Sequence, residues 1–205
     1  MPSLRKPGTR FFDHLINAVL IFLSVWLAFW MNERSHQKRE ARKTEAFKCE
    51  VLAEFRNTQA ILTQSIPYHQ SLYEGVARLL LEQIDTLETF SMSHLPEYTN
   101  GIQRDIITNN TWRLLNSEEL SLDLKLKLWI NHLFEQQQFV TGATEDVVDH
   151  LGSREMYQPD LIEQNYIMLG RLLVELYWQE RTYLENLEKG IELLEADLGE
   201  KGCQP

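Results

Sequence analysis

An unbroken apolar segment near the N-terminus is the strongest pattern in the chain. Residues 14–32 carry no formal charge, and Phe11 and Phe12 extend the apolar stretch toward the N-terminus. A helix over residues 11–32 would be about 30 Å long, which matches the thickness of a bilayer core. No later segment repeats this pattern. The sequence therefore predicts one transmembrane helix, with Trp26 and Trp30 placed for an aromatic belt at its far end.

A cleaved secretory signal is the alternative explanation, because Arg5, Lys6 and Arg10 form a basic region ahead of the segment. Signal cleavage requires small residues just after a shorter apolar core. This segment instead ends in large side chains, Phe29-Trp30-Met31. The ending favours a retained anchor that follows a basic N-terminal tail over residues 1–10.

Helix-favouring residues continue beyond the span without Pro or Gly as far as Pro67. The first turns are charged on all sides, and apolar residues then return at the spacing of one helical face. That face consists of Phe47, Val51, Leu52, Phe55, Ile61, Leu62 and Ile66. We therefore predict a helical stalk over residues 33–66, which needs a partner in a later helix or in a second chain.

An acidic helical body is predicted over residues 67–198. Pro67 predicts a break or a kink, after which the helical periodicity resumes over residues 68–84, most simply as the second arm of a hairpin. Residues 85–100 lack periodicity and predict a long loop, and helical signals return over residues 102–115.

The segment Leu120–Ile130 alternates apolar and polar residues, which taken alone predicts a strand. We predict a helix, because Leu, Lys and Asp are not β-branched, and because Asn116 with Glu119, or Ser121 with Asp123, supplies a helix start. Further on, Thr141-Gly142 predicts an interruption, Thr144 the N-cap of a short helix, and Gly152 its end.

A long C-terminal helix is predicted after the turn at Gln158-Pro159-Asp160, where Asp160 and Glu163 resemble a capping box. Its apolar residues alternate steps of three and four up to Leu198, with one gap at Glu180, and a tail over residues 199–205 follows. The helix-seam candidates are Leu173, Leu176, Leu187, Ile191 and Leu194. They fit a coiled coil with a second chain or with the stalk, and equally the core face of an antiparallel helical bundle. The predicted fold class is all-α.

Charge is divided unevenly along the chain. Residues 1–48 hold nine basic and four acidic side chains, whereas residues 49–205 hold eleven and twenty-six. The acidic body argues against nucleic acid as a partner, because phosphates require a basic face. The basic segment after the span fits anionic lipid head groups, or simply a solvated helix surface. Its candidates are Arg34, Lys38, Arg39, Arg42 and Lys43.

Basic residues on the two sides of the span favour opposite membrane orientations by similar amounts. More basic residues follow the span than precede it, and by the positive-inside rule this predicts a body in the cytoplasm. The basic N-terminal tail resists translocation and pulls the other way. Within the span, Asn17, Ser24 and Ala28 share a stripe that a second membrane helix could contact, although isolated small residues are common in such helices.

No residue set in the sequence identifies a reaction. The chain has no nucleophile elbow, no phosphate-binding glycine loop and no metal-binding His-Glu-x-x-His. Asp146, Asp149 and His150 form the best metal candidate, but an acidic helix surface produces such a trio by chance, and His132 reads as a packed or surface histidine. The cysteines, Cys49 and Cys203, predict neither a metal site nor a disulfide framework. We therefore expect no catalytic, cofactor or metal site.

The membrane exit, Phe29-Trp30-Met31-Asn32-Glu33-Arg34, and the segment Val51–Phe55 resemble a widespread bacterial family of small single-span membrane proteins of unknown function. The run Thr111–Asn116 is similar to the second recurrent segment of that family, while Met31 departs from its exit motif. The resemblance covers about a third of the chain and implies a bacterial inner membrane protein.

Three functions remain open from the sequence. The first is a membrane-anchored helical interaction or scaffold protein without catalytic activity, which forms a homo-oligomer or binds another membrane protein. The second is a ligand-sensing module that signals through its stalk, with an unknown small molecule bound among Trp112, Trp129, Tyr166 and Trp178. The third, a membrane-bound hydrolase, has no motif in its favour.

Overall fold

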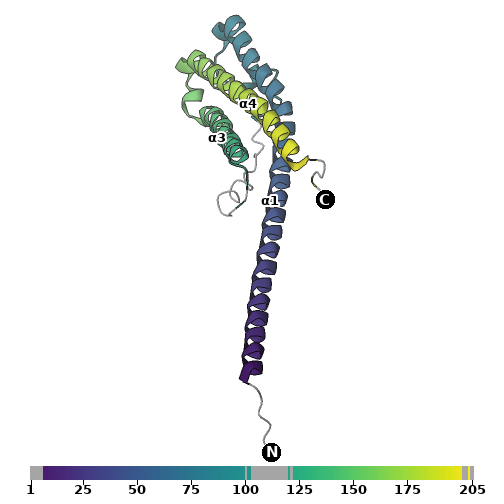
Figure 1. Ribbon diagram of the computed structural model, residues 1–205. Helices are drawn as coiled ribbons and strands as arrows, with labels where there is room; N and C mark the ends of the chain where they lie inside the picture. The colour runs from purple at the N-terminus through teal and green to yellow at the C-terminus, as the bar shows by residue number, and fades with distance from the viewer. Residues whose placement is uncertain (1–6, 100, 103–119, 121, 200–202, 204–205) are drawn as a thin grey trace, which may run out of the picture. The chain divides into compact units, whose positions relative to one another are not determined.

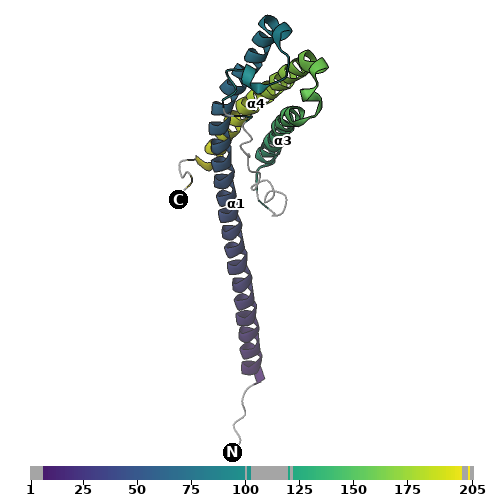
Figure 2. The same ribbon diagram turned by 180° about the vertical axis from the view of Figure 1, so that it is seen from behind.

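The computed structural model describes residues 7–99, 101–102, 120, 122–199 and 203. Within these residues the protein is helical and contains no strand, which confirms the all-α prediction (Figures 1 and 2). The α-helices are α1 (Pro7–Glu82), α3 (Leu124–Gly152) and α4 (Ile162–Leu198); the short 3-10 helices are η1 (Ile84–Thr86), η2 (Met92–His94), η3 (Glu155–Tyr157) and η4 (Pro159–Leu161). The chain forms two compact units, residues 1–45 and 46–205.

The first unit is the N-terminal part of α1. Its apolar side chains from Leu15 to Met31 are exposed, and the most apolar window has a mean hydropathy of 1.9 with none of its residues buried. In the described part of the chain, this is the one helix long and apolar enough to cross a membrane. An exposed apolar helix of this length is stable only where lipid or another helix covers it.

The second unit, here called the body, contains the remainder of α1 together with α3 and α4. Contacts between α1 and α4 run in opposite directions along the two helices, from Lys48 beside Asp197 to Tyr73 beside Tyr177, so these helices are antiparallel. Contacts of α3 with α4 show the same relation, from Gln136 beside Asn186 to His150 beside Asn165. The body is therefore a three-helix bundle in which α1 and α3 run in the same direction.

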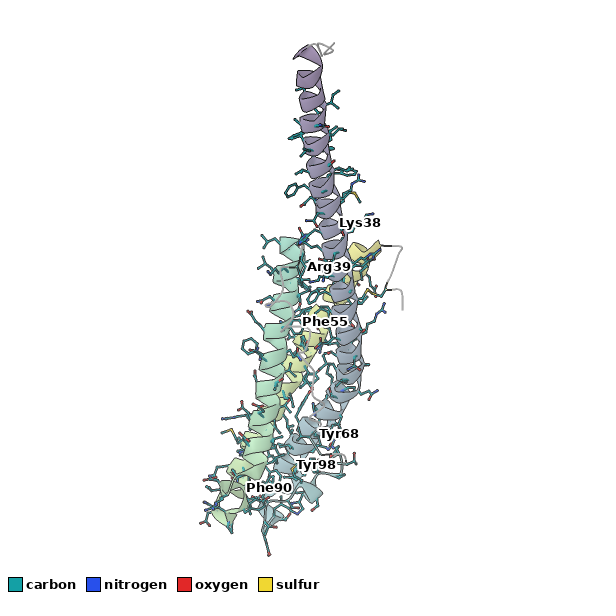
Figure 3. All side chains as sticks on the ribbon, turned by 90° about the horizontal axis from the view of Figure 1, so that it is seen from below. Lys38, Arg39, Phe55, Tyr68, Phe90 and Tyr98 are labelled. Carbon is teal, nitrogen blue, oxygen red and sulfur yellow. A yellow bond between two sulfur atoms is a disulfide. The ribbon has the colours of Figure 1, made fainter. Side chains whose placement is uncertain are left out.

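The predicted helix seam forms the core of this bundle. Leu173, Leu176, Leu187 and Leu194 are fully buried and Ile191 is 7% exposed, all packed against side chains of the same chain. The apolar face predicted for the stalk is buried with them, including Phe55, which is labelled in Figure 3. The Phe55 ring of α1 meets Phe134 of α3 with ring centroids 5.8 Å apart. The seam is not free to pair with a second chain, so the intermolecular reading of these residues is wrong. The compact unit also begins at Ala46, within the predicted stalk.

Two predicted helix breaks do not occur. Pro67 lies inside α1, and Gly142 lies inside α3 with the Thr144 hydroxyl donating to the Val140 carbonyl rather than capping a helix. An internal proline disfavours a helix by about 3 kcal/mol and a glycine by about 1 kcal/mol. Burial of the flanking residues in the bundle outweighs both, so the hairpin predicted at Pro67 is wrong.

Other helix ends agree better with the sequence. Leu120–Ile130 contains the start of α3, where the Asp123 carboxylate accepts the N–H groups of Lys125 and Leu126. Gly152 ends α3, and Gly199 ends α4 at a positive φ of 63° that suits glycine. The capping box proposed at Asp160 is wrong, because Leu161 precedes α4 and makes no side-chain cap.

The segment after α1 returns over the end of the bundle. Over residues 85–99, the described part of the predicted loop, it contains short 3-10 helices but no α-helix or strand. Phe90, labelled in Figure 3, and Leu95 are buried, and the Phe90 ring lies against the Tyr166 ring. The Tyr166 hydroxyl donates to the Ser91 carbonyl at 2.9 Å, and Arg78 pairs with Glu97. The helical signals of residues 103–115 lie outside the described residues.

Cys49 and Cys203 form a disulfide, with their Cα atoms 5.5 Å apart. The prediction of no disulfide is therefore wrong. The prediction rested on the large separation of the two cysteines in the sequence. The antiparallel arrangement of α1 and α4 brings Cys203 back to the beginning of the body, next to Cys49.

Candidate functional site

On the candidate membrane-spanning part of α1, the predicted contact residues lie on the helix surface. Asn17, Ser24 and Ala28 are all exposed, and the Ser24 hydroxyl donates to the Leu20 carbonyl within the helix. At the far end of the span, Trp26 stacks on Trp30 with centroids 6.4 Å apart. This aromatic pair has the form of an interfacial anchor.

The basic segment begins directly after these aromatic residues. The Arg34 guanidinium lies 4.3 Å from the centroid of the Trp30 ring, a cation–π contact. Lys38, Arg39, Arg42 and Lys43 are exposed (Figure 3 labels the first two). Their positive charges can reach lipid phosphates, because long basic side chains extend toward head groups.

The body contains a polar cluster in the middle of its core, formed by Ser65, His69 and Glu180. The Ser65 hydroxyl donates to Oε1 of Glu180 at 3.1 Å, and His69 Nδ1 lies 2.9 Å from Oε2. The His69 and Glu180 side chains are 1% and 5% exposed. Nε2 of His69 meets no hydrogen-bond partner among the described residues. The cluster therefore joins α1 to α4 through charge-assisted hydrogen bonds shielded from solvent.

This geometry does not make a hydrolytic site. A serine nucleophile needs a histidine base within hydrogen-bond reach, but Ser65 and His69 instead hold the two different oxygens of Glu180. The cluster is also closed to substrate, since all three residues are buried. Its arrangement fits a structural role, fixing the register between two helices.

Buried tyrosines accompany this cluster along α4. Burial raises the pKa of Tyr183, and the nearby negative charge of Glu54 raises it further. Burial also raises the pKa of Tyr166, although the hydrogen bond to the Ser91 carbonyl partly opposes that shift. Both phenols are held in their neutral form.

The aromatic residues proposed for a ligand pocket do not converge. Tyr166 is fully buried against Phe90, whereas Trp178 is 54% exposed. Trp129 lies beside Gly190, which is 24 residues from Tyr166 along α4 and so about 36 Å away at 1.5 Å per residue. Trp112 lies outside the described residues. Tyr166 and Trp129 are therefore too far apart to line one small-molecule site.

The residues considered for metal binding or base catalysis have ordinary surroundings. Asp146 and Asp149 are exposed, and His150 Nε2 donates to the Asn165 carbonyl at 3.2 Å. His132 is exposed and packs edge-on against Trp129. Among the described residues, no group of three metal-ligating side chains is close enough to hold an ion.

An apolar stripe runs along the outer face of α4. Ile167, Val174 and Trp178 are 36%, 37% and 54% exposed and are separated by seven and four residues, so they project from the same side of the helix. Arg181 lies over the Trp178 ring at 5.5 Å and pairs with Glu185 at 3.4 Å. We call these three apolar residues the outer stripe.

The end of α4 and the residue Cys203 beyond it are attached to α1 by one disulfide and two ion pairs. Besides the disulfide, Lys48 Nζ lies 2.5 Å from Asp197 and Arg56 lies 2.7 Å from Glu195. Cys203 itself is exposed. We call the disulfide and these two ion pairs the clasp.

Two of these features were missed by sequence reasoning. The gap at Glu180 in the apolar repeat was a usable signal, since a carboxylate at a core position must be paired inside the body. The outer stripe falls between the core positions of α4 and had no signal of its own. No protein-family model, curated protein or solved structure matches the chain, so the resemblance at the membrane exit stays a prediction.

Proposed function

We propose that this protein is a membrane-anchored helical interaction protein that self-associates and has no catalytic activity of its own. The observation that carries the proposal is the outer stripe. Ile167, Val174 and Trp178 stay exposed although the same helix buries a complete apolar face in the core. Exposed apolar stripes rimmed by polar residues are typical of protein contact surfaces, and tryptophan is enriched at their centres.

A second copy of the chain is the partner that best fits this surface. Arg171 and Glu175, and likewise Arg181 and Glu185, place both charge signs along the stripe. When two copies meet through this surface, basic side chains of one copy can therefore face acidic side chains of the other. Anchoring in one bilayer also raises the local concentration of copies, which favours association through a small contact.

A photo-crosslinking amino acid at position 178 tests this proposal in native membranes. We expect ultraviolet light to yield a product of twice the 24.2 kDa chain mass, containing two differently tagged copies. The control is the same amino acid at Phe139, which is 63% exposed on α3 and lies outside the stripe. A homodimer product from Phe139 alone, or from neither position, would contradict the proposed surface.

We further propose that the basic segment binds anionic lipid head groups and that the bilayer is the first partner of the chain. The support is the exposure of Arg34, Lys38, Arg39 and Arg42 next to the Trp30 anchor. Each nearby cation contributes about 1 kcal/mol at an anionic surface. A peptide of residues 26–48 should bind vesicles containing phosphatidylglycerol and lose affinity at high salt, whereas equal binding to neutral vesicles would contradict a charge-dependent contact.

A further inference from the structure

The disulfide of the clasp indicates the kind of compartment in which the body folds. The chain has two cysteines, and both are used in the Cys49–Cys203 bond. The Cα separation of 5.5 Å lies within the range of ordinary disulfides. This bond joins residues 154 positions apart and closes almost the whole body into one loop.

The neighbouring contacts make this pairing specific. Lys48 precedes Cys49 and pairs with Asp197, while Arg56, about two helical turns further along α1, pairs with Glu195. Gly199 then turns the backbone at the end of α4. The two cysteines are therefore brought together by the folded body, because ion pairs on both chain segments already align the end of α4 with α1.

Such a bond does not persist in the cytosol when a reductant can reach it. Glutathione and thioredoxin keep cytosolic thiols reduced, and structural disulfides belong to oxidising compartments. Cys203 is exposed and Cys49 is only partly covered, so small reductants have access to the bond.

We propose that the body, residues 46–205, lies in an oxidising compartment on the non-cytosolic side of the membrane. The N-terminal tail then remains in the cytosol, consistent with its Arg5, Lys6 and Arg10. This inference goes beyond the proposed function and does not rest on it. The proposed orientation is opposite to the one expected from the charge count. That count rests on an excess of only a few basic residues after the span over those before it.

Formation of the bond needs an electron acceptor, and the fitting class is a thiol–disulfide oxidoreductase in its disulfide form. One cysteine thiolate attacks a sulfur of that disulfide, and a mixed disulfide forms as the other oxidoreductase sulfur leaves as a thiolate. The second cysteine thiolate then attacks the mixed disulfide. The body gains its disulfide, and the oxidoreductase becomes a dithiol that has taken two electrons and two protons.

Thiol labelling of the full chain in spheroplasts of a bacterial host tests this topology. The probes are a membrane-impermeant maleimide and the impermeant reductant TCEP, and labelled cysteines are counted by mass. We expect no labelling without TCEP and labelling of intact spheroplasts after TCEP. In Cys49→Ser, the freed Cys203 should be labelled in intact spheroplasts without any reductant, which keeps the test valid if reduction loosens the body.

Three outcomes would overturn the proposal. Labelling that appears only after detergent lysis, with or without TCEP, would place the body in the cytosol. Labelling of intact spheroplasts without TCEP would show free thiols on the non-cytosolic side, and would overturn the oxidising compartment and the disulfide from which it is inferred. A Cys49→Ser chain labelled only after lysis would assign the body to the cytosol independently of the bond.

Discussion

The carboxylate of Glu180 occupies a core position of α4, where Ser65 and His69 of α1 hold its two oxygens. Removing one member of a buried pair leaves the other without a partner and typically destabilises by about 3–5 kcal/mol, whereas replacing both by apolar residues is often neutral. We expect Glu180→Leu to lower the free energy of unfolding by about 3 kcal/mol. The double variant Glu180→Leu with His69→Leu should recover most of this loss.

Urea unfolding of the detergent-solubilised chain, followed by circular dichroism, measures both values. The matched control is Glu188→Leu, an exposed position on the same helix that should change stability by less than about 0.5 kcal/mol. The single variant His69→Leu completes the comparison. If the double variant lost as much stability as Glu180→Leu and His69→Leu combined, His69 and Glu180 would not be energetically coupled.

The buried phenol of Tyr183 is expected to make the body less stable at alkaline pH. Its pKa is raised by burial, so the folded state holds the phenol proton more tightly than the unfolded state. The contribution of the buried neutral phenol to the free energy of unfolding is therefore fully present below the ordinary tyrosine pKa of about 10. Above that pH the free energy of unfolding falls by about 1.4 kcal/mol per pH unit for each buried phenol of raised pKa. Tyr183→Phe should reduce this slope, as measured by urea unfolding between pH 9 and 11.

The exposed Tyr157 provides the control for this experiment. Tyr157→Phe should leave the alkaline slope unchanged. Equal slopes in the parent chain and in Tyr183→Phe would mean that the buried phenol does not govern alkaline stability.

At the scale of elements, two glycines in helix interiors have opposite surroundings. A Cβ at Gly190 of α4 would collide with the Leu133 side chain and lie 3.0 Å from Trp129 Nε1, whereas a Cβ at Gly142 of α3 would meet nothing within 4 Å. Overpacking costs about 1–3 kcal/mol, and the helix preference of alanine over glycine returns up to about 1 kcal/mol. Gly190 therefore permits the close approach of α4 to α3.

We expect Gly142→Ala to stabilise the body by about 0.5–1 kcal/mol and Gly190→Ala to destabilise it by about 1 kcal/mol. Thermal unfolding of the two variants in parallel measures the contrast. A stabilised Gly190→Ala would show that Leu133 and Trp129 move aside and that the contact between α3 and α4 is not tight.

The apolar patterns predicted which faces of these helices are buried, because periodicity reports burial directly. Leu173, Leu187 and the Phe55 face lie where that pattern requires. The breaks at Pro67 and Gly142 were mispredicted, since local preferences of 1–3 kcal/mol are smaller than the burial that tertiary packing supplies. The disulfide had no local signal, because it depends on the direction in which α4 returns along α1.

At the scale of the whole molecule, the two faces of α4 have separate roles. The inner face, with Leu176, forms the core of the body, and the outer stripe, with Trp178, is proposed to contact a second copy. The apolar N-terminal part of α1 is proposed to anchor the chain in the membrane, and the clasp fixes the end of α4 to α1. An arrangement in which the long heptad helix itself were the interface would leave the body without a core.

Leu176 and Trp178 provide the most direct test of this division, because they are two residues apart and 0% and 54% exposed. The measurement follows mass by light scattering and helicity by thermal circular dichroism on Leu176→Asp and Trp178→Glu in detergent. We predict that Leu176→Asp abolishes the cooperative unfolding transition, whereas Trp178→Glu keeps that transition and becomes a monomer. A Leu176→Asp chain that unfolds cooperatively as a monomer, or an oligomer unaffected by Trp178→Glu, would contradict the division of α4 into a core face and a contact face.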